Sequence, residues 1–166
     1  MKPLNRKVLE AGAAGVLLSA LRVLIGVLFV VSGFEKLIQP PENFLFVIQN
    51  YDMLNERLEA AAAHVLPWFE LFGGAFLAAG LWTRAAACVV WALNTAFIAA
   101  VSQALARKLP IDECGCFGEL ISLPLPAVLA MDAAVWLACA AMLAFPGSAS
   151  RLSFDRFLAR GAGEAR

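Results

Sequence analysis

Charged residues are scarce in this sequence, and their scarcity excludes several classes of protein. Only 16% of the 166 residues are charged, and the 13 basic side chains are balanced by 13 acidic ones. No excess of positive charge therefore favours a nucleic-acid partner. The chain has one histidine and four cysteines, and two of these, Cys88 and Cys139, lie inside apolar segments. Since a structural metal site usually needs four ligands of this kind, no metal centre is expected.

Apolar residues, by contrast, make up 61% of the chain, and its mean hydropathy is +0.76. Soluble domains contain roughly 45–50% apolar residues. The excess is gathered in runs long enough to cross a bilayer. We predict an all-α fold, an integral membrane four-helix bundle over residues 16–146. Its spans are predicted at about residues 16–38, 64–82, 85–105 and 123–145.

A shorter amphipathic segment follows the first predicted span. Pro40 and Pro41 end that span, because proline lacks the N–H group that a helix interior needs. From residue 44 to residue 58, apolar residues recur at steps of three and four, which is typical of an amphipathic helix. They are Phe44, Val47, Ile48, Tyr51, Leu54 and Leu58. The segment is too polar to span, so we predict an interfacial helix that lies along the membrane surface or caps the bundle.

The basic residues are distributed unevenly between the two sides of the predicted bundle. One side carries Lys2, Arg6, Lys7, Arg84, Arg151, Arg156, Arg160 and Arg166, and the other carries Arg57, Arg107 and Lys108. Because loops rich in lysine and arginine stay inside, the segments 1–15 and 147–166 are predicted to be cytoplasmic. The loop before the last span then lies outside the cytoplasm, where disulfides persist.

That outer loop carries two cysteines one residue apart. Residues 111–119 read I-D-E-C-G-C-F-G-E, with Cys114 and Cys116 separated by a glycine. A disulfide closed across one residue is held away from relaxed geometry, and strain makes such a bond more reducible. A redox-active pair is the favoured interpretation. A structural pair or free thiols come second, and half of a metal site comes third.

Several polar residues fall within or beside the apolar runs. Ionisable groups inside a membrane are costly unless they are paired, so each is a functional candidate. They are Arg22, Glu35, Lys36, His64, Glu70, Asn94 and Asp132. Lys36 with Glu70 and Arg22 with Asp132 are either ion pairs that fix packing or groups that handle protons. His64 is expected to be interfacial.

Three segments of the chain resemble a known family. They are R-V-L-I-G-V-L-F-V-V-S-G-F-E-K-L-I-Q-P at Arg22–Pro40, L-P-W-F-E-L-F-G-G at Leu66–Gly74 and I-D-E-C-G-C-F-G at Ile111–Gly118. Over about residues 20–145 the chain resembles the MauE branch of the DoxX-like membrane proteins. The resemblance implies a multi-pass protein of the bacterial inner membrane. It also implies a role in maturing a disulfide-rich protein such as methylamine dehydrogenase, together with a thioredoxin-like partner.

The resemblance suggests a membrane thiol–disulfide oxidoreductase in which Cys114 and Cys116 are the exchanging pair. Its partner would be a thioredoxin-like periplasmic protein or a secreted disulfide-containing substrate. A quinone is expected as the membrane cofactor, near Glu35, Trp68, Glu70 and Phe117. Quinone-linked disulfide oxidases use C-x-x-C, whereas this chain has C-x-C, which leaves the direction of electron flow open. The alternative is a non-catalytic membrane scaffold or maturation factor that docks a periplasmic partner.

Overall fold

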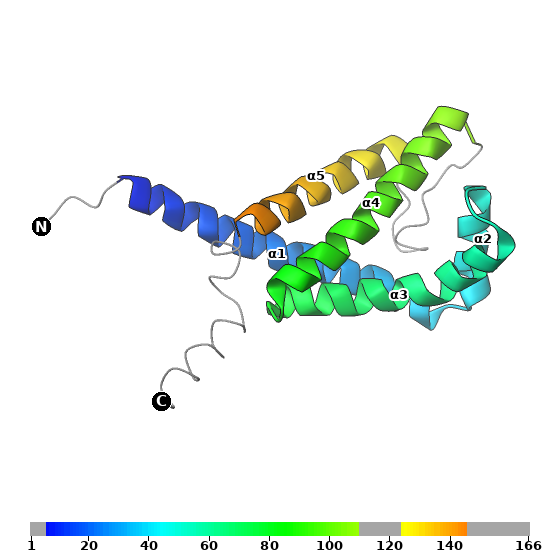
Figure 1. Cartoon of the computed structure of the whole chain (residues 1–166), viewed down its shortest axis with the longest axis horizontal. Helices are drawn as coiled ribbons and strands as arrows, with labels where there is room; N and C mark the ends of the chain where they lie inside the picture. Colours follow the sequence, from blue (N-terminus) through cyan, green and yellow to red (C-terminus); the bar gives the residue numbers. More distant parts are fainter. Residues whose placement is uncertain (1–5, 110–123, 146–166) are drawn as a thin grey trace, which may run out of the picture.

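The computed structural model of the chain describes residues 6–109 and 124–145, with side chains from residue 15 onward. This part of the chain is helical without strands. Its five helices are α1 (Arg6–Ile38), α2 (Pro41–Asn50), α3 (Glu56–Ala79), α4 (Thr83–Arg107) and α5 (Leu125–Ala144) (Figure 1). All except α2 are long and apolar enough to cross a membrane. The prediction of an all-α bundle of four spans, with one further helix after the first, is confirmed.

Two pairs of helices make up the bundle. Helix α1 packs along α3, helix α4 packs along α5, and α3 and α4 join the two pairs (Figure 1). The α1–α3 contact depends on glycines that face each other. A Cβ on Gly26 would lie 2.5 Å from the backbone nitrogen of Ala78, and one on Gly74 would lie 2.7 Å from the carbonyl oxygen of Gly26. The backbones therefore approach more closely than any larger residue would allow.

The main core lies between the four long helices. Its buried apolar residues come from all of them: Ile25, Phe29, Leu77, Ala86, Ala87, Val90, Leu93, Cys139 and Met142. Cys139 is fully buried there, as expected for a cysteine that acts as a small apolar residue. Cys88 is exposed on the surface of α4, so it does not pack in the core.

The amphipathic helix is shorter than predicted and the second span begins earlier. Helix α2 ends at Asn50 rather than at Leu58, and Asp52 in the following connection has a positive φ of 48°. Helix α3 begins at Glu56 because the side-chain oxygen of Asn55 accepts a hydrogen bond, 3.0 Å long, from the backbone N–H of Leu58. Asparagine is a favoured residue at this capping position. Pro67, which lies near the predicted start of the second span at residue 64, is therefore in the middle of α3.

The turn between the second and third spans also differs from the expected position at Thr83 and Arg84. Helix α3 ends at Ala79 and is capped by Gly80, whose φ of 69° is left-handed. The N–H groups of Gly80 and Leu81 donate hydrogen bonds back to the carbonyl oxygens of Leu77 and Phe76. Glycine suits this conformation because it has no Cβ. Thr83 and Arg84 belong instead to the first turn of α4.

Candidate functional site

The helices that flank the predicted cysteine loop end beside α2. Cys114, Cys116 and Phe117 themselves lie outside the described residues. The last turns of α4 and the first turn of α5 pack with the end of α2 in a second buried cluster, made of Tyr51, Val101, Ala104, Leu125 and Val128. At the surface, Arg107 Nη2 lies 2.6 Å from Asp52 Oδ2. The end of α4 and the start of α5, which flank the cysteine segment, therefore lie at the same end of the bundle as α2 (Figure 1).

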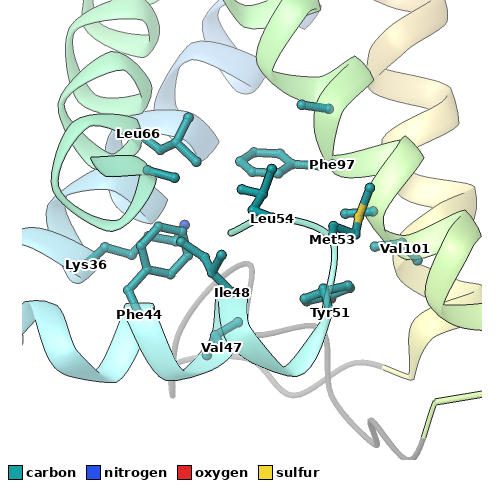
Figure 2. Close-up of a pocket in the computed structure, with 13 residues that line it drawn as sticks. Lys36, Phe44, Val47, Ile48, Tyr51, Met53, Leu54, Leu66, Phe97 and Val101 are labelled. Atoms are coloured by element: carbon teal, nitrogen blue, oxygen red, sulfur yellow. The ribbon is translucent and has the colours of Figure 1, made fainter. Parts of the chain in front are cut away.

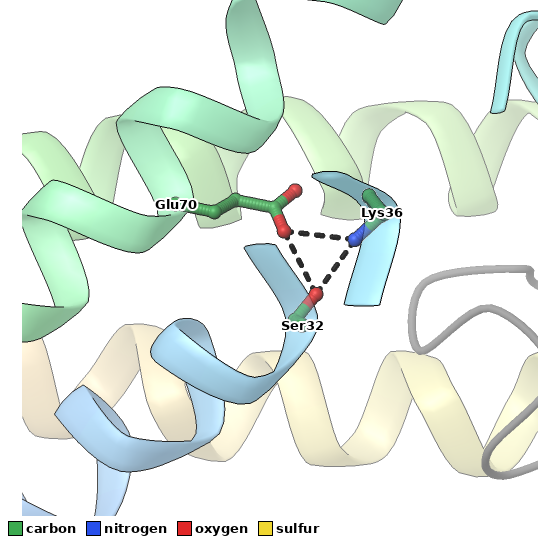
Figure 3. A network of polar contacts seen from close by, with 3 residues as sticks. All are labelled: Ser32, Lys36 and Glu70. Atoms are coloured by element: carbon green, nitrogen blue, oxygen red, sulfur yellow. Dashed lines mark hydrogen bonds and ion pairs between the residues drawn. The ribbon is translucent and has the colours of Figure 1, made fainter. Parts of the chain in front are cut away.

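A buried cluster of three polar side chains joins α1 to α3 near this end. Lys36 Nζ donates hydrogen bonds to Glu70 Oε2 at 2.8 Å and to Ser32 Oγ at 2.6 Å (Figure 3). Ser32 Oγ in turn donates to Glu70 Oε2 at 2.8 Å. The side chains of Lys36 and Glu70 are only 3% and 0% exposed. The predicted Lys36–Glu70 ion pair is present, and Ser32 completes it.

The second carboxylate oxygen of Glu70 takes no part in the ion pair. Glu70 Oε1 is buried and has no hydrogen-bond partner among the described residues. On the other side of the pair, Lys36 Nζ lies 5.2 Å from the centre of the Phe44 ring, which belongs to α2. A cation over an aromatic face is stabilised by the ring's negative potential. The ammonium group of Lys36 therefore links α1, α3 and α2 at one point.

A second polar pair lies between α4 and α5. Asn94 Nδ2 donates to Asp132 Oδ1 at 3.2 Å, and both residues are buried. The predicted Arg22–Asp132 ion pair is absent, since Asp132 bonds to Asn94 instead and no such pair forms in the described part of the chain. A small cavity of about 30 Å³ is lined by Asp132, Ser32 and Phe97, with Leu28, Phe29, Met131 and Val135 completing its wall. This cavity separates the two polar clusters.

The other candidate residues lie apart from these clusters. Arg22 is 1% exposed on α1, and Glu35 is 4% exposed and accepts a hydrogen bond from Gln39. His64 is exposed, with Nδ1 2.8 Å from the carbonyl oxygen of Ala60, and its interfacial position stays a prediction. Trp68 is half-exposed and stacks on Phe72 of its own helix.

Trp68 and Glu70 accordingly lie on different sides of α3. Two residues along a helix correspond to a rotation of about 200°, which explains why one side chain is exposed and the other is buried. The structure brings Lys36 and Glu70 together, and Asn94 and Asp132. It does not bring Trp68 to either pair.

A larger cavity opens between α2, α3 and α4. Its volume is about 200 Å³, and it is partly enclosed (Figure 2). The lining is almost entirely apolar: Phe44, Val47, Ile48, Met53, Leu54, Ala62, Leu66, Ala96, Phe97, Ala100 and Val101. Lys36 and Tyr51 add the two lining side chains that can donate hydrogen bonds. The cavity therefore suits an apolar molecule with a few acceptor atoms.

Tyr51 stays protonated throughout the physiological range. Burial, with a smaller contribution from the negative charge of Asp132, raises the pKa of Tyr51 from 10.0 to about 12. A phenol in that state retains its O–H donor. Tyr51 follows the last turn of α2, where its side chain belongs both to the second buried cluster and to the cavity wall.

The family of the chain follows from the match of its sequence to a family model. The model of the methylamine utilisation protein MauE matches residues 14–146, which include all four spans. The chain belongs to the MauE family. No curated protein and no solved structure matched. The MauE match and the four spans together indicate a multi-pass membrane protein linked to methylamine utilisation. The wider resemblance to DoxX-like proteins stays a prediction.

Some site residues of this MauE family member could have been predicted from spacing. Ser32 lies four residues before Lys36, and residues four apart share a face of a helix. The same rule places Phe44, Val47 and Tyr51 on one apolar face, although Tyr51 directly follows the end of α2. The pairing of Asn94 with Asp132 has no such signal, because the two residues lie on different helices 38 positions apart.

Proposed function

We propose that this protein is a membrane thiol–disulfide oxidoreductase in which Cys114 and Cys116 exchange with an extracytoplasmic partner. The observation that carries the proposal is the Cys-Gly-Cys sequence itself, placed between two helices whose adjoining ends meet beside α2. A large apolar cavity lies at the same end of the bundle. Membership of a family linked to methylamine utilisation is consistent with a role in maturation, and the redox step goes beyond it.

The exchange proceeds through a mixed disulfide. A partner thiolate attacks one sulfur of the Cys114–Cys116 disulfide, and the other cysteine leaves as a thiolate and takes up a proton. The partner's second thiol then attacks the mixed disulfide. This step gives the partner disulfide and returns both cysteines of this protein as thiols. Two electrons and two protons have passed from the partner dithiol to Cys114 and Cys116.

Restoring the disulfide requires an acceptor for these electrons. A quinone bound in the membrane would take up two electrons and two protons and become a quinol. The residues expected around it do not form one pocket, since Glu35, Trp68 and Glu70 line neither cavity. Tyr51 and Lys36 offer donors at the large cavity instead. We place the protein in the bacterial inner membrane, with both termini in the cytoplasm and a thioredoxin-like or secreted protein as partner.

The experiment uses single-cysteine variants. Cys116→Ser should trap a mixed disulfide with the partner in intact cells, visible as a band that disappears on reduction. Cys114→Ser and Cys116→Ser should each abolish maturation of the secreted substrate, whereas Cys88→Ser should leave it unchanged. Full maturation with either serine variant, and no trapped species, would instead support the non-catalytic scaffold.

A further inference from the structure

We propose that the cavity between α2, α3 and α4 binds the head group of a quinone, a flat apolar ring that carries carbonyl oxygens. This site differs from the quinone site expected from the sequence near Glu35, Trp68 and Glu70, and its redox role rests on the proposed function. The inference depends on three properties of the cavity: its size, its two donors and its opening to the surface.

The size of the cavity suits a substituted six-membered ring. An apolar cavity of about 150 Å³ in another protein accommodates benzene. The cavity here, at about 200 Å³, is larger by roughly the volume of two methyl substituents. Ala62, Ala96 and Ala100 contribute no more than a methyl group each to the wall, which leaves this space open. A ring fits, whereas a folded lipid with two acyl chains does not.

The two donors stand at the α2 side of the cavity. Lys36 reaches it beside the Phe44 ring, and Tyr51 lies further along α2 (Figure 2). A carbonyl oxygen can accept from an ammonium or a phenol, and hydrogen bonds to a charged donor are the stronger kind. The remaining wall is hydrocarbon, including the Phe97 ring from α4 (Figure 2). A plain alkyl chain would use the hydrocarbon but neither donor.

The cavity is also accessible from the surface. Met53 and Leu54, in the connection between α2 and α3, are each 44% exposed, and Ala96 of α4 is exposed as well. A tail attached to the ring can leave between these residues. The cavity lies at the end of the bundle where the two helices that flank the cysteine segment meet.

The experiment measures binding in the absence of thiol chemistry. The protein carrying both Cys114→Ser and Cys116→Ser is reconstituted in lipid nanodiscs and titrated with ubiquinone-1, a short-chain quinone. Retention of the radiolabelled quinone and the thermal shift of the protein are both recorded. Because the cysteines are absent, binding here is independent of the proposed oxidoreductase activity. If the wild-type protein proved to have no oxidoreductase activity, quinone binding to this variant would still support the site. If this variant failed to bind the quinone, the oxidoreductase proposal would remain open to its own test.

Two neighbouring residues of α4 provide a matched pair of variants. Ala96 and Ala99 are both exposed, but only Ala96 lines the cavity. Ala96→Phe should weaken ubiquinone-1 binding at least tenfold, since the new ring occupies the space of the ligand's ring. Ala99→Phe adds the same ring outside the cavity and should leave binding unchanged. Ala100→Phe fills the cavity from a more buried position and serves as the second test.

The donors are tested by conservative changes. Tyr51→Phe removes one O–H group, and the joint Lys36→Met, Glu70→Leu variant removes the ammonium group without stranding its partner. Loss of the bond to the Tyr51 phenol should weaken binding by roughly two- to twelvefold, and loss of the bond to the charged Lys36 ammonium should weaken it by roughly twelve- to 160-fold. Equal binding by Ala96→Phe and Ala99→Phe would overturn the site. Equal competition by a carbonyl-free alkane such as hexadecane would overturn the ligand class and assign the cavity to acyl chains.

Discussion

Replacing Glu70 with glutamine tests whether the buried ion pair holds α1 against α3. The substitution keeps the shape of the side chain and its ability to form hydrogen bonds, but it removes the negative charge. Lys36 would then keep its hydrogen bond to Ser32 and its contact with the Phe44 ring, but it would lose the carboxylate that balances its charge. Both members of the pair are almost completely buried, so water cannot replace the lost carboxylate. We expect the bundle to lose stability.

The expected loss is about 3–5 kcal/mol, the typical cost of removing one partner from a buried ion pair. This is a large part of the roughly 5–15 kcal/mol that usually separates the folded from the unfolded state. Unfolding by denaturing detergent in mixed micelles, followed by circular dichroism, measures the change. Glu56→Gln on the same helix is the matched control, because Glu56 is exposed in the first turn of α3. It should cost less than about 1 kcal/mol.

The joint Lys36→Met, Glu70→Leu variant separates the structural role from a catalytic one. Apolar residues of similar volume often replace a buried ion pair without loss, so its stability should return to within about 1 kcal/mol of the wild type. A Glu70→Gln protein that unfolds within about 1 kcal/mol of the wild type would refute the structural argument. If the same protein also lost substrate maturation, Glu70 would instead be assigned to proton transfer.

Two further predictions address helix packing and topology. Gly74→Ala should destabilise the bundle by about 1–3 kcal/mol in the same unfolding assay, because its Cβ would lie 2.7 Å from the Gly26 carbonyl oxygen. Gly73→Ala would meet side-chain atoms rather than backbone, those of Val89 at 3.1 Å and Val90 at 3.6 Å, and should be nearly neutral. Equal effects of the two changes would contradict the close approach of α1 and α3. A membrane-impermeant maleimide should label Cys114 and Cys116 in reduced spheroplasts but leave Cys88 and Cys139 unlabelled. Labelling of the pair only in inverted vesicles would reverse the assigned orientation.

The sequence predicts the membrane fold well because hydrophobic length is a local property. Each span needs about 20 apolar residues, and such runs can be read without knowing the neighbouring helices. The α1 stripe that contains Gly26 and Gly33 was also predictable, since residues on one face recur at fixed spacing. The Lys36–Glu70 pair followed from similar depth and opposite charge. Arg22 and Asp132 also carry opposite charges, but for them the same reasoning gave the wrong pair.

Asp132 shows why depth in the membrane and charge were not enough to predict its partner. An aspartate on α5 can bond only to a residue that faces it on a packed neighbour, and the helix packed most closely on α5 is α4. Asn94 lies on the buried face of α4 and satisfies one oxygen of the carboxylate. The choice of neighbour depends on how the helices are arranged around the bundle, which no local pattern records. Tertiary arrangement therefore decided this contact.

The early end of α2 has the largest consequence for the candidate site. A helix continued to Leu58 would have kept Tyr51, Leu54 and Leu58 on one apolar face, as their spacing suggested. The chain instead leaves the helix after Tyr51, passes through the left-handed Asp52 and restarts at the Asn55 cap. Leu54 then lines the cavity from the connecting segment, while Leu58 is 53% exposed on α3. The cavity lies where this break turns α3 back beside α2, so the capping side chain of Asn55 helps to shape the proposed quinone site.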